Sequence, residues 1–496
     1  MRPYILIAAI SATLLAAPTG WTAAPFDVFE DATLRVDFYQ VGNAERELIV
    51  LDRLIRQGPW AGPRADLTHA AELGRYAVEL RQPADGQVLF ALGFDSYFGE
   101  YRTTGPARDG VDRAYHNTVL VPMPRAPALL VISSRQAGAE PVELLRRDID
   151  PASIDIAAEP AAPGAVVVVA HEAGPPSATL DIAIVGEGYQ RTEEATFRAD
   201  LERVAALLLG FEPYASHRQQ IAIRGVLVPS AASGIDEPTR GRWVSTAVGA
   251  SFNSLGSERY LLTEDNRALR DVAANVPYDL LIVMINDDRY GGGGIFNAYC
   301  TFTAHSQWAD YLLLHELGHS FAGLADEYYS SDVAYNEFYP PGVEPAEPNI
   351  TALLDPATLK WRELVAGDTP IPTPWGKAAF DAASQAYGDR RRELNEQIAE
   401  ASRAGASAEE ISRLEGQLET LAEQHAKEVR IALAAEPFNG AVGAFEGAGY
   451  ASTGLYRPML DCLMFSRGMK PFCRVCERAV GDMIRHHTAA LETPAP

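Results

Sequence analysis

The chain changes its residue pattern near position 150, and this change limits the fold more than any other feature of the sequence. Before this point apolar and polar residues alternate in short runs, at residues 34–40, 76–80, 88–94 and 128–133, with Gly, Pro and Asp between them. Short strands separated by turn residues are typical of a β-sandwich. We therefore expect an all-β sandwich domain over residues 25–150.

A different pattern begins at residue 165, after a connection rich in Pro and small residues at 151–164. Apolar strands now alternate with helices; the expected strands are 165–170, 179–185, 221–228 and 279–286, and the expected helices are 192–209 and 254–272. This alternation favours a mostly parallel sheet covered by helices. We predict an α/β (α+β) domain with a twisted sheet over residues 165–490, and 496 residues are also too many for a single core.

One segment of the second domain, at about residues 380–433, has the composition of a helical hairpin. It is rich in Ala, Glu, Arg and Gln, carries apolar residues at helical spacing, and is interrupted by Gly405. We interpret it as an insertion. A solvated extension is favoured over an arm that binds a partner.

The N-terminal residues 1–24 have the pattern of a signal peptide. Arg2 gives a positive start, an apolar run follows over Tyr4–Ala17, and small residues lie at Ala23 and Ala24. The chain is therefore expected to be exported, to the periplasm, the cell surface or the medium. No later stretch reaches about 18 uninterrupted apolar residues, so stable membrane insertion is not expected.

The formal charge of -24, from 66 acidic and 42 basic residues, argues against nucleic acid as a partner. A surface of this sign repels phosphate backbones. The charge identifies no particular substrate, and the oligomeric state is left open.

The segment from Trp308 to Tyr329 reads W-A-D-Y-L-L-L-H-E-L-G-H-S-F-A-G-L-A-D-E-Y-Y. His315 and His319 are four residues apart, so on a helix both imidazoles project from one face and can bind one zinc ion. Glu316 lies beside the first ligand and can take a proton from zinc-bound water, whose pKa the metal lowers toward about 7. The pattern predicts a zinc-dependent hydrolase of peptide bonds with Glu316 as general base.

A catalytic zinc usually has a third protein ligand, for which Asp326 is our candidate. In the pattern H-E-x-x-H-x-x-G-x-x-H a Gly ends the helix and the ligand follows three residues later. Gly323 lies one place later than in that pattern, but the residue three beyond it is Asp326, whose carboxylate suits zinc. Glu327 is the main alternative.

Three further features are candidates for the site. The glycine run in Tyr290–Ala304 precedes the zinc helix and predicts either a flexible hairpin or a strand edge to which an extended peptide can add. Met464, in preference to Met459, is the candidate for a methionine beneath the metal ligands. Tyr456 is a candidate donor to the oxyanion, or else a packed structural tyrosine.

The four cysteines allow disulfides or a second metal site; they are Cys300, Cys462, Cys473 and Cys476. The metal alternative joins Cys473, Cys476 and Cys462 with His486 or His487. Since one C-x-x-C pair is weak evidence for a metal, we favour disulfides or free thiols.

Four stretches of the sequence resemble the bacterial immunoglobulin A peptidase-type zinc metallopeptidases, which are placed among the metzincins. They are I-A-I-V-G-E-G-Y from Ile182, Y-G-G-G-G from Tyr290, H-E-L-G-H-S-F-A-G-L-A-D-E-Y from His315, and G-L-Y-R-P from Gly454. The N-terminal region resembles the accessory domain that often precedes this catalytic domain.

The resemblance implies a metzincin-like zinc endopeptidase in which His315 and His319 bind the metal, Glu316 is the base and the third ligand is acidic. It does not establish immunoglobulin A as the substrate, because loops set substrate choice. The alternative is a non-catalytic surface binding protein with a structural zinc site. The presence of Glu316 argues against it, since a structural site needs no base.

Overall fold

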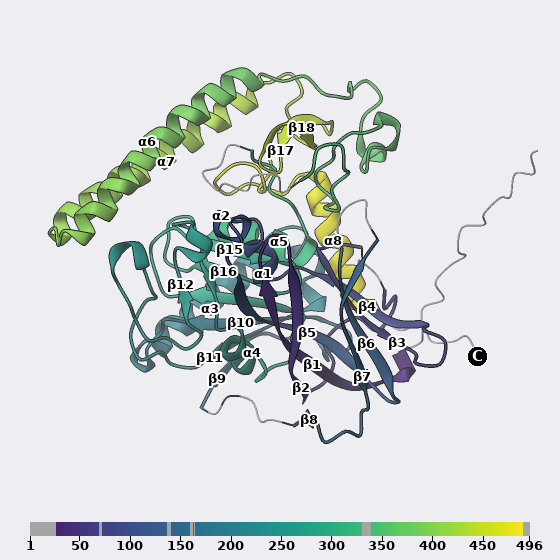
Figure 1. Ribbon diagram of the computed structural model, residues 1–496. Coiled ribbons are helices and arrows are strands. Elements are labelled where there is room, and N and C mark those ends of the chain that lie inside the picture. The colour runs from purple at the N-terminus through teal and green to yellow at the C-terminus, as the bar shows by residue number, and fades with distance from the viewer. Residues whose placement is uncertain are drawn as a thin grey trace, which may run out of the picture.

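The computed structural model describes residues 26–68, 72–135, 140–158, 162, 164–329 and 339–489. The predicted signal peptide at residues 1–24 lies outside this part of the chain. The N-terminal region forms two four-stranded sheets, with orders β5-β1-β2-β8 and β4-β3-β6-β7 (Figure 1). The strands are β1 (Phe29–Gly42), β2 (Glu47–Gln57), β3 (Tyr76–Arg81), β4 (Val88–Phe94), β5 (Arg113–Pro124), β6 (Ala128–Ser134), β7 (Val142–Ile149) and β8 (Ile156–Ala157).

The two N-terminal sheets enclose one apolar core. Alternate residues of each strand point to the same side, so Leu34 and Val36 of β1 meet Val78 and Leu80 of β3 in this core. The short strand β8 comes from the segment that we interpreted as a connection, and it pairs in parallel with β2. Part of the connection therefore extends the first sheet.

The C-terminal region is built on a six-stranded sheet with the order β15-β16-β14-β10-β11-β9. The four inner strands run parallel, and the edge strands β15 and β9 run antiparallel to their neighbours. The strands are β9 (Val166–His171), β10 (Leu180–Glu187), β11 (Ile221–Leu227), β14 (Leu280–Ile285), β15 (Gly292–Ile295) and β16 (Tyr299–Thr303). The protein thus has a mixed α/β architecture with several sheets.

Both faces of this six-stranded sheet are covered, which explains why β10 and β14 are apolar throughout. On β10, Ile182 and Ile184 face a core that includes residues of α3 (Glu194–Gly210), α5 (Ala309–Ala322) and α8 (Arg474–Thr488). Ala183 and Val185 face α4 (Asn266–Ala273) and, from the N-terminal region, α1 (Tyr97–Tyr101). The N-terminal region, which also contains α2 (Gly105–Arg108), therefore packs on one face of the sheet.

The helix expected at 254–272 is much shorter in the structure. Asn253 and Leu255 have φ values of 61° and 54°, in the left-handed region that a helix cannot contain. These two residues lie in the connection of a short hairpin formed by β12 (Ala250–Ser251) and β13 (Leu262–Thr263). The helix α4 begins only after Asp265, which caps it by accepting from Ala268 N. The expectation was wrong before residue 266, because turn geometry overrides the helical composition.

The predicted helical hairpin is present as α6 (Lys377–Arg403) and α7 (Ala408–Ala434), which lie side by side and extend from the rest of the chain (Figure 1). Its tip touches the loop around residue 240, where Arg240 Nη1 lies 2.7 Å from Glu415 Oε1. The short strands β17 (Phe445–Ala448) and β18 (Ala451–Arg457) follow it. Among the described helices, none has the length and apolar character needed to cross a membrane.

The edge strand β15 lies directly against α5, and its glycines make this contact possible. A Cβ on Gly294 would lie 2.4 Å from Glu316 O and 3.0 Å from His319 Cβ. A Cβ on Gly292 would lie 3.1 Å from Glu316 Cγ. The glycine run therefore serves close packing of a strand on the helix that carries the histidines, and it is not a freely flexible hairpin.

We predict that Gly294→Ala destabilises the protein by about 1–3 kcal/mol, the usual cost of overpacking, because the new methyl group overlaps the helix backbone. The matched control is Gly416→Ala on the exposed face of α7, where a Cβ meets nothing within 4 Å. That change should raise stability by roughly 0.5–1 kcal/mol. Thermal unfolding of the two variants checks this, and equal midpoints would contradict the packing argument.

Stability should also depend on the ionisation of Asp287, just beyond the end of β14. Burial raises the pKa of this carboxyl to about 6, with further contributions from Glu237 and Asp288. The folded-state pKa lies above the unfolded value of about 3.9, so the protonated form favours folding at low pH and this contribution is lost as pH rises through about 6.

Asp287→Asn should therefore stabilise the protein by roughly 1–3 kcal/mol at about pH 8, and change little at about pH 4. The amide oxygen can still accept from Arg289 N, which the aspartate does at 2.9 Å. Denaturant unfolding of the variant and the wild type at both pH values measures this difference in the free energy of unfolding. A stabilisation that is the same at the two pH values would refute the titration of Asp287.

Candidate active site

The helix α5 carries His315 and His319 and ends where the sequence places Gly323. Gly323 adopts the left-handed conformation with φ 58°, and Leu324 N donates to Gly318 O at 3.2 Å, which closes the helix end. The chain then turns back toward the histidines. Asp326 Oδ1 lies 3.0 Å from His315 Nε2 and 3.2 Å from His319 Nε2, and the two Nε2 atoms are 3.2 Å apart.

Backbone carbonyls fix the tautomer of both imidazoles. His315 Nδ1 lies 3.1 Å from Leu463 O, and His319 Nδ1 lies 2.6 Å from Leu324 O. A carbonyl oxygen only accepts, so each Nδ1 carries the proton and donates it. In the neutral rings both Nε2 atoms then present lone pairs, and these converge with a carboxylate oxygen on one point.

Three acceptors that face each other repel unless a proton or a metal cation lies between them. The Asp326 oxygen that faces the histidines is buried and has no hydrogen-bond partner. Donors about 2.0–2.1 Å from a tetrahedral zinc lie about 3.3 Å apart, close to the separations in this cluster. The donor set of two imidazoles and one carboxylate therefore fits a zinc ion in number, chemistry and spacing.

The charges around these groups also favour a cation. Burial lowers the pKa of His319, but the Asp326 carboxylate outweighs this effect and raises it to about 9. Burial raises the pKa of Glu316, whose side chain follows His315 and lines the adjoining cavity. A carboxylate with a raised pKa is suited to accept and return a proton near neutral pH.

The two candidates for the third ligand point to different places. Asp326 faces the histidines, whereas Glu327 Oε1 lies 3.1 Å from Cys476 Sγ in a separate buried cluster. The structure thus brings together His315, His319, Glu316 and Asp326, and does not place Glu327 with them.

A cavity of about 510 Å³ opens beside this group and is lined by His315, Glu316, His319 and Asp326. One wall is the edge strand β15, and another is formed by α6 and α7, which contribute Tyr387 and His425. Much of the helical hairpin is exposed, as expected of a solvated extension, and its inner side also lines the cavity.

Tyr450 is a residue of the site that the sequence did not indicate. It lies between β17 and β18 with φ 63°, and its hydroxyl donates to Asp326 Oδ2. Tyr456, the tyrosine that we considered, is paired through its backbone with Thr351 and is not among the residues that line the cavity. In the sequence Tyr450 is marked only by the glycines before it, Gly447 and Gly449. Turns that contain glycine are too common to identify a residue of the site.

Met464 lies under the helix at the level of the second histidine. Its sulfur is 3.0 Å from the position that a Cβ on Gly318 would take. The methionine can pack this close to α5 because Gly318 has no side chain. Met464 O also accepts from Glu327 N at 2.9 Å. Met464, in preference to Met459, thus contacts both segments that carry the candidate ligands.

Comparison with known families agrees with this geometry. A family model described as IgA peptidase M64 matches residues 168–484, and a model described as the peptidase M64 N-terminus matches residues 25–145. No curated protein matches the chain. Since the first model spans well over half of the sequence, the chain belongs to the IgA peptidase M64 family and is a peptidase, a hydrolase whose substrates are proteins or peptides.

Proposed function

We propose that the protein is a secreted zinc metalloendopeptidase in which His315, His319 and Asp326 bind the zinc ion. The convergence of two imidazole lone pairs and an unpaired carboxylate oxygen beside an open cavity supports this most strongly. Membership of a peptidase family supplies the reaction class. The metzincin-like character of the catalytic region is part of the same proposal.

Each side chain has a separate role in the proposed mechanism. When bound, a zinc ion supplies Lewis-acid polarisation of the scissile carbonyl and of a water molecule. Glu316 accepts the proton of the attacking water and returns it to the leaving amine nitrogen. Leu463 O and Leu324 O keep the imidazoles in the tautomer that leaves Nε2 free, and Tyr450 holds Asp326 in place through its hydroxyl.

The edge strand β15 is the proposed site for the substrate backbone. Gly292 O accepts from Leu261 N on the side away from β16, and backbone groups alternate in direction along a strand. Gly294, two residues on, therefore directs its N–H and C=O to that same outer side. An extended peptide can pair with the N–H and C=O of Gly294 and pass over Glu316 and the metal ligands.

The roles of the other regions follow from their positions. The sandwich at residues 25–150 is proposed as an accessory domain. It packs, together with α4, on one face of the six-stranded sheet, while the zinc helix packs on the opposite face. The pattern of residues 1–24 supports export. Residues 165–490 then form the catalytic domain.

Replacing Glu316 by Gln tests the mechanism. We expect Glu316→Gln to retain the metal and to lose about 100- to 10,000-fold in kcat/KM, because the amide cannot accept the proton. Cleavage of a diverse peptide library by the purified full chain, with metal content measured on the same samples, gives both quantities. Unchanged cleavage would overturn the proposal, and an inactive wild type that binds zinc would favour the non-catalytic binding protein.

Replacing Asp326 tests the third ligand, with Tyr450→Phe as a graded comparison. We expect Asp326→Ala to weaken zinc binding at the His site by more than about 100-fold, and loss of the tyrosine hydrogen bond to weaken it by about 10- to 100-fold. Titration with a zinc-buffered chelator measures these affinities. Equal affinity of Asp326→Ala and the wild type would exclude Asp326 as a ligand.

A further inference from the structure

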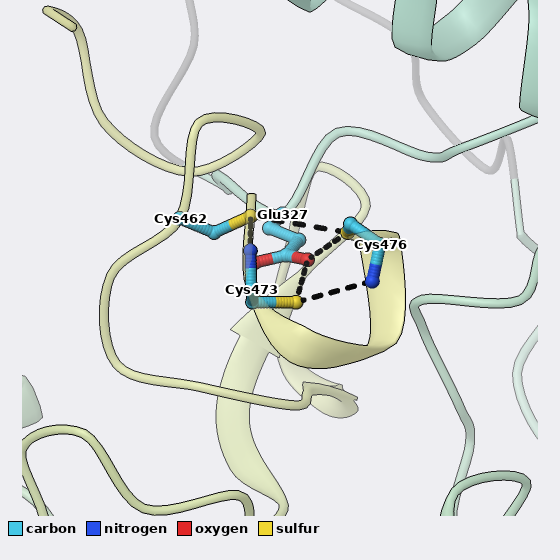
Figure 2. Close-up of side chains that lie close together, drawn as sticks. All are labelled: Glu327, Cys462, Cys473 and Cys476. Carbon is cyan, nitrogen blue, oxygen red and sulfur yellow. Dashed lines mark hydrogen bonds between the residues drawn. The ribbon is translucent and has the colours of Figure 1, made fainter. Parts of the chain in front are cut away.

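Three of the four cysteines gather in a second buried cluster around Glu327, outside the proposed catalytic site. Cys462, Cys473 and Cys476 direct their sulfurs toward the Glu327 carboxylate, and all four ligand atoms lie within 4.8 Å of one another (Figure 2). Cys462 comes from a loop, Cys473 and Cys476 come from the start of α8, and Glu327 follows the zinc helix. We propose that this cluster binds a second, structural zinc ion through three thiolates and one carboxylate.

The spacing of the cluster matches that of ligands around one ion. Two sulfurs about 2.3 Å from a tetrahedral zinc lie about 3.8 Å apart, and a sulfur and a carboxylate oxygen lie about 3.6 Å apart. The distance from Cys462 Sγ to Cys476 Sγ is 3.8 Å. Glu327 Oε1 lies 3.1 Å from Cys476 Sγ and 3.7 Å from Cys473 Sγ. A disulfide bond is near 2.05 Å, and all four cysteines are free thiols.

The buried carboxylate gives a second and independent reason for a cation. The Glu327 side chain is fully buried, and its Oε2 atom has no hydrogen-bond partner. Its Oε1 atom accepts from Asn349 Nδ2 at 3.2 Å, and the nearby buried Arg457 supplies one positive charge. When the three thiols give up their protons to bind an ion, the cluster carries four negative charges, and Arg457 and a divalent ion together offset three of them.

Backbone N–H groups donate to two of the three sulfurs, as they do to thiolates that bind a metal. Cys473 N donates to Cys462 Sγ at 3.1 Å, and Met464 N donates to the same sulfur at 3.4 Å. Cys473 is the N-cap of α8, and its own sulfur accepts from Cys476 N at 3.4 Å. Thiolates are the form that binds zinc, and they suit zinc better than Mg²⁺ or Ca²⁺.

The ligand set differs from the metal alternative that the sequence suggested. His486 and His487 lie in the last turn of α8, whereas the cysteines lie at its start. His487 Nδ1 instead lies 3.0 Å from Asp279 Oδ1. Glu327, which the sequence indicated only as a rival for the catalytic ligand, takes the fourth place.

The second ion would connect the segments that build the catalytic site. Glu327 adjoins Asp326, and Cys462 adjoins Leu463, whose carbonyl accepts from His315. Binding at the cluster therefore fixes both the third catalytic ligand and the orientation of the first histidine. Such a site contributes to folding stability and needs no open position for water.

Metal analysis of the purified full chain tests the proposal independently of peptide cleavage. We expect about two zinc ions per chain in the wild type, and about one in both His315→Ala/His319→Ala and Cys473→Ser/Cys476→Ser. Cys300→Ala, which removes a buried cysteine outside the cluster, is the matched control and should keep both. One ion in the wild type that is lost with the histidines would overturn the proposal.

Cobalt substitution keeps the proposal testable if the double cysteine variant does not fold. The Co²⁺-loaded wild type and His315→Ala/His319→Ala should both show sulfur-to-cobalt charge-transfer absorption, which a site of imidazole and carboxylate ligands cannot give. Absence of this absorption, or a Cys462–Cys476 disulfide found by mass spectrometry of the unreduced protein, would overturn it. Cleavage activity does not enter either measurement, so its absence would bear on the proposed function alone.

Discussion

The two hydrogen bonds from imidazole Nδ1 to backbone carbonyls are the interactions on which the geometry of the proposed catalytic site depends. A histidine on a helix can turn either nitrogen toward a metal, and its proton can reside on either. Here Leu463 O and Leu324 O settle both questions, because each accepts a proton that only Nδ1 can provide. The Nε2 atoms then face Asp326, and they lie on the side of α5 that lines the cavity.

These carbonyls belong to segments that are held by other parts of the fold. Leu324 follows the left-handed Gly323 that ends α5, so the helix end itself positions the acceptor for His319. Leu463 lies between Cys462 and Met464, in a segment tied to the start of α8 and to Glu327 N. The strand β15 closes the other side of α5, where glycine allows backbone contact. The helix α5 is thus confined from several directions before any metal is considered.

Much of this arrangement could be predicted from the sequence, because its signals are local. His315, Glu316 and His319 lie within a single helical turn, and Gly323 and Asp326 follow at short spacing. The apolar strands of the central sheet were likewise evident, since strands buried on both faces have continuous apolar runs. The membership of the peptidase family was also indicated correctly by these motifs.

The remainder depended on contacts between distant residues, which local patterns do not contain. Tyr450 reaches Asp326 across 124 positions, and Cys476 reaches Glu327 across 149. The strands β2 and β5 pair with β1 on either side, but their sequences do not show clear alternation. The helix expected at 254–272 failed because left-handed residues within it interrupt a favourable composition.

The adjacent acids Asp326 and Glu327 show how one short segment can serve two sites. The peptide group between them is held on both sides: Gly449 N donates to Asp326 O, while Glu327 N donates to Met464 O. Asp326 faces the histidines and Glu327 faces the cysteines. A shift of one residue in this pairing would therefore remove a candidate ligand from both clusters at once. The register of these few backbone bonds, more than the choice between two similar acids, determines which carboxylate reaches the proposed catalytic site.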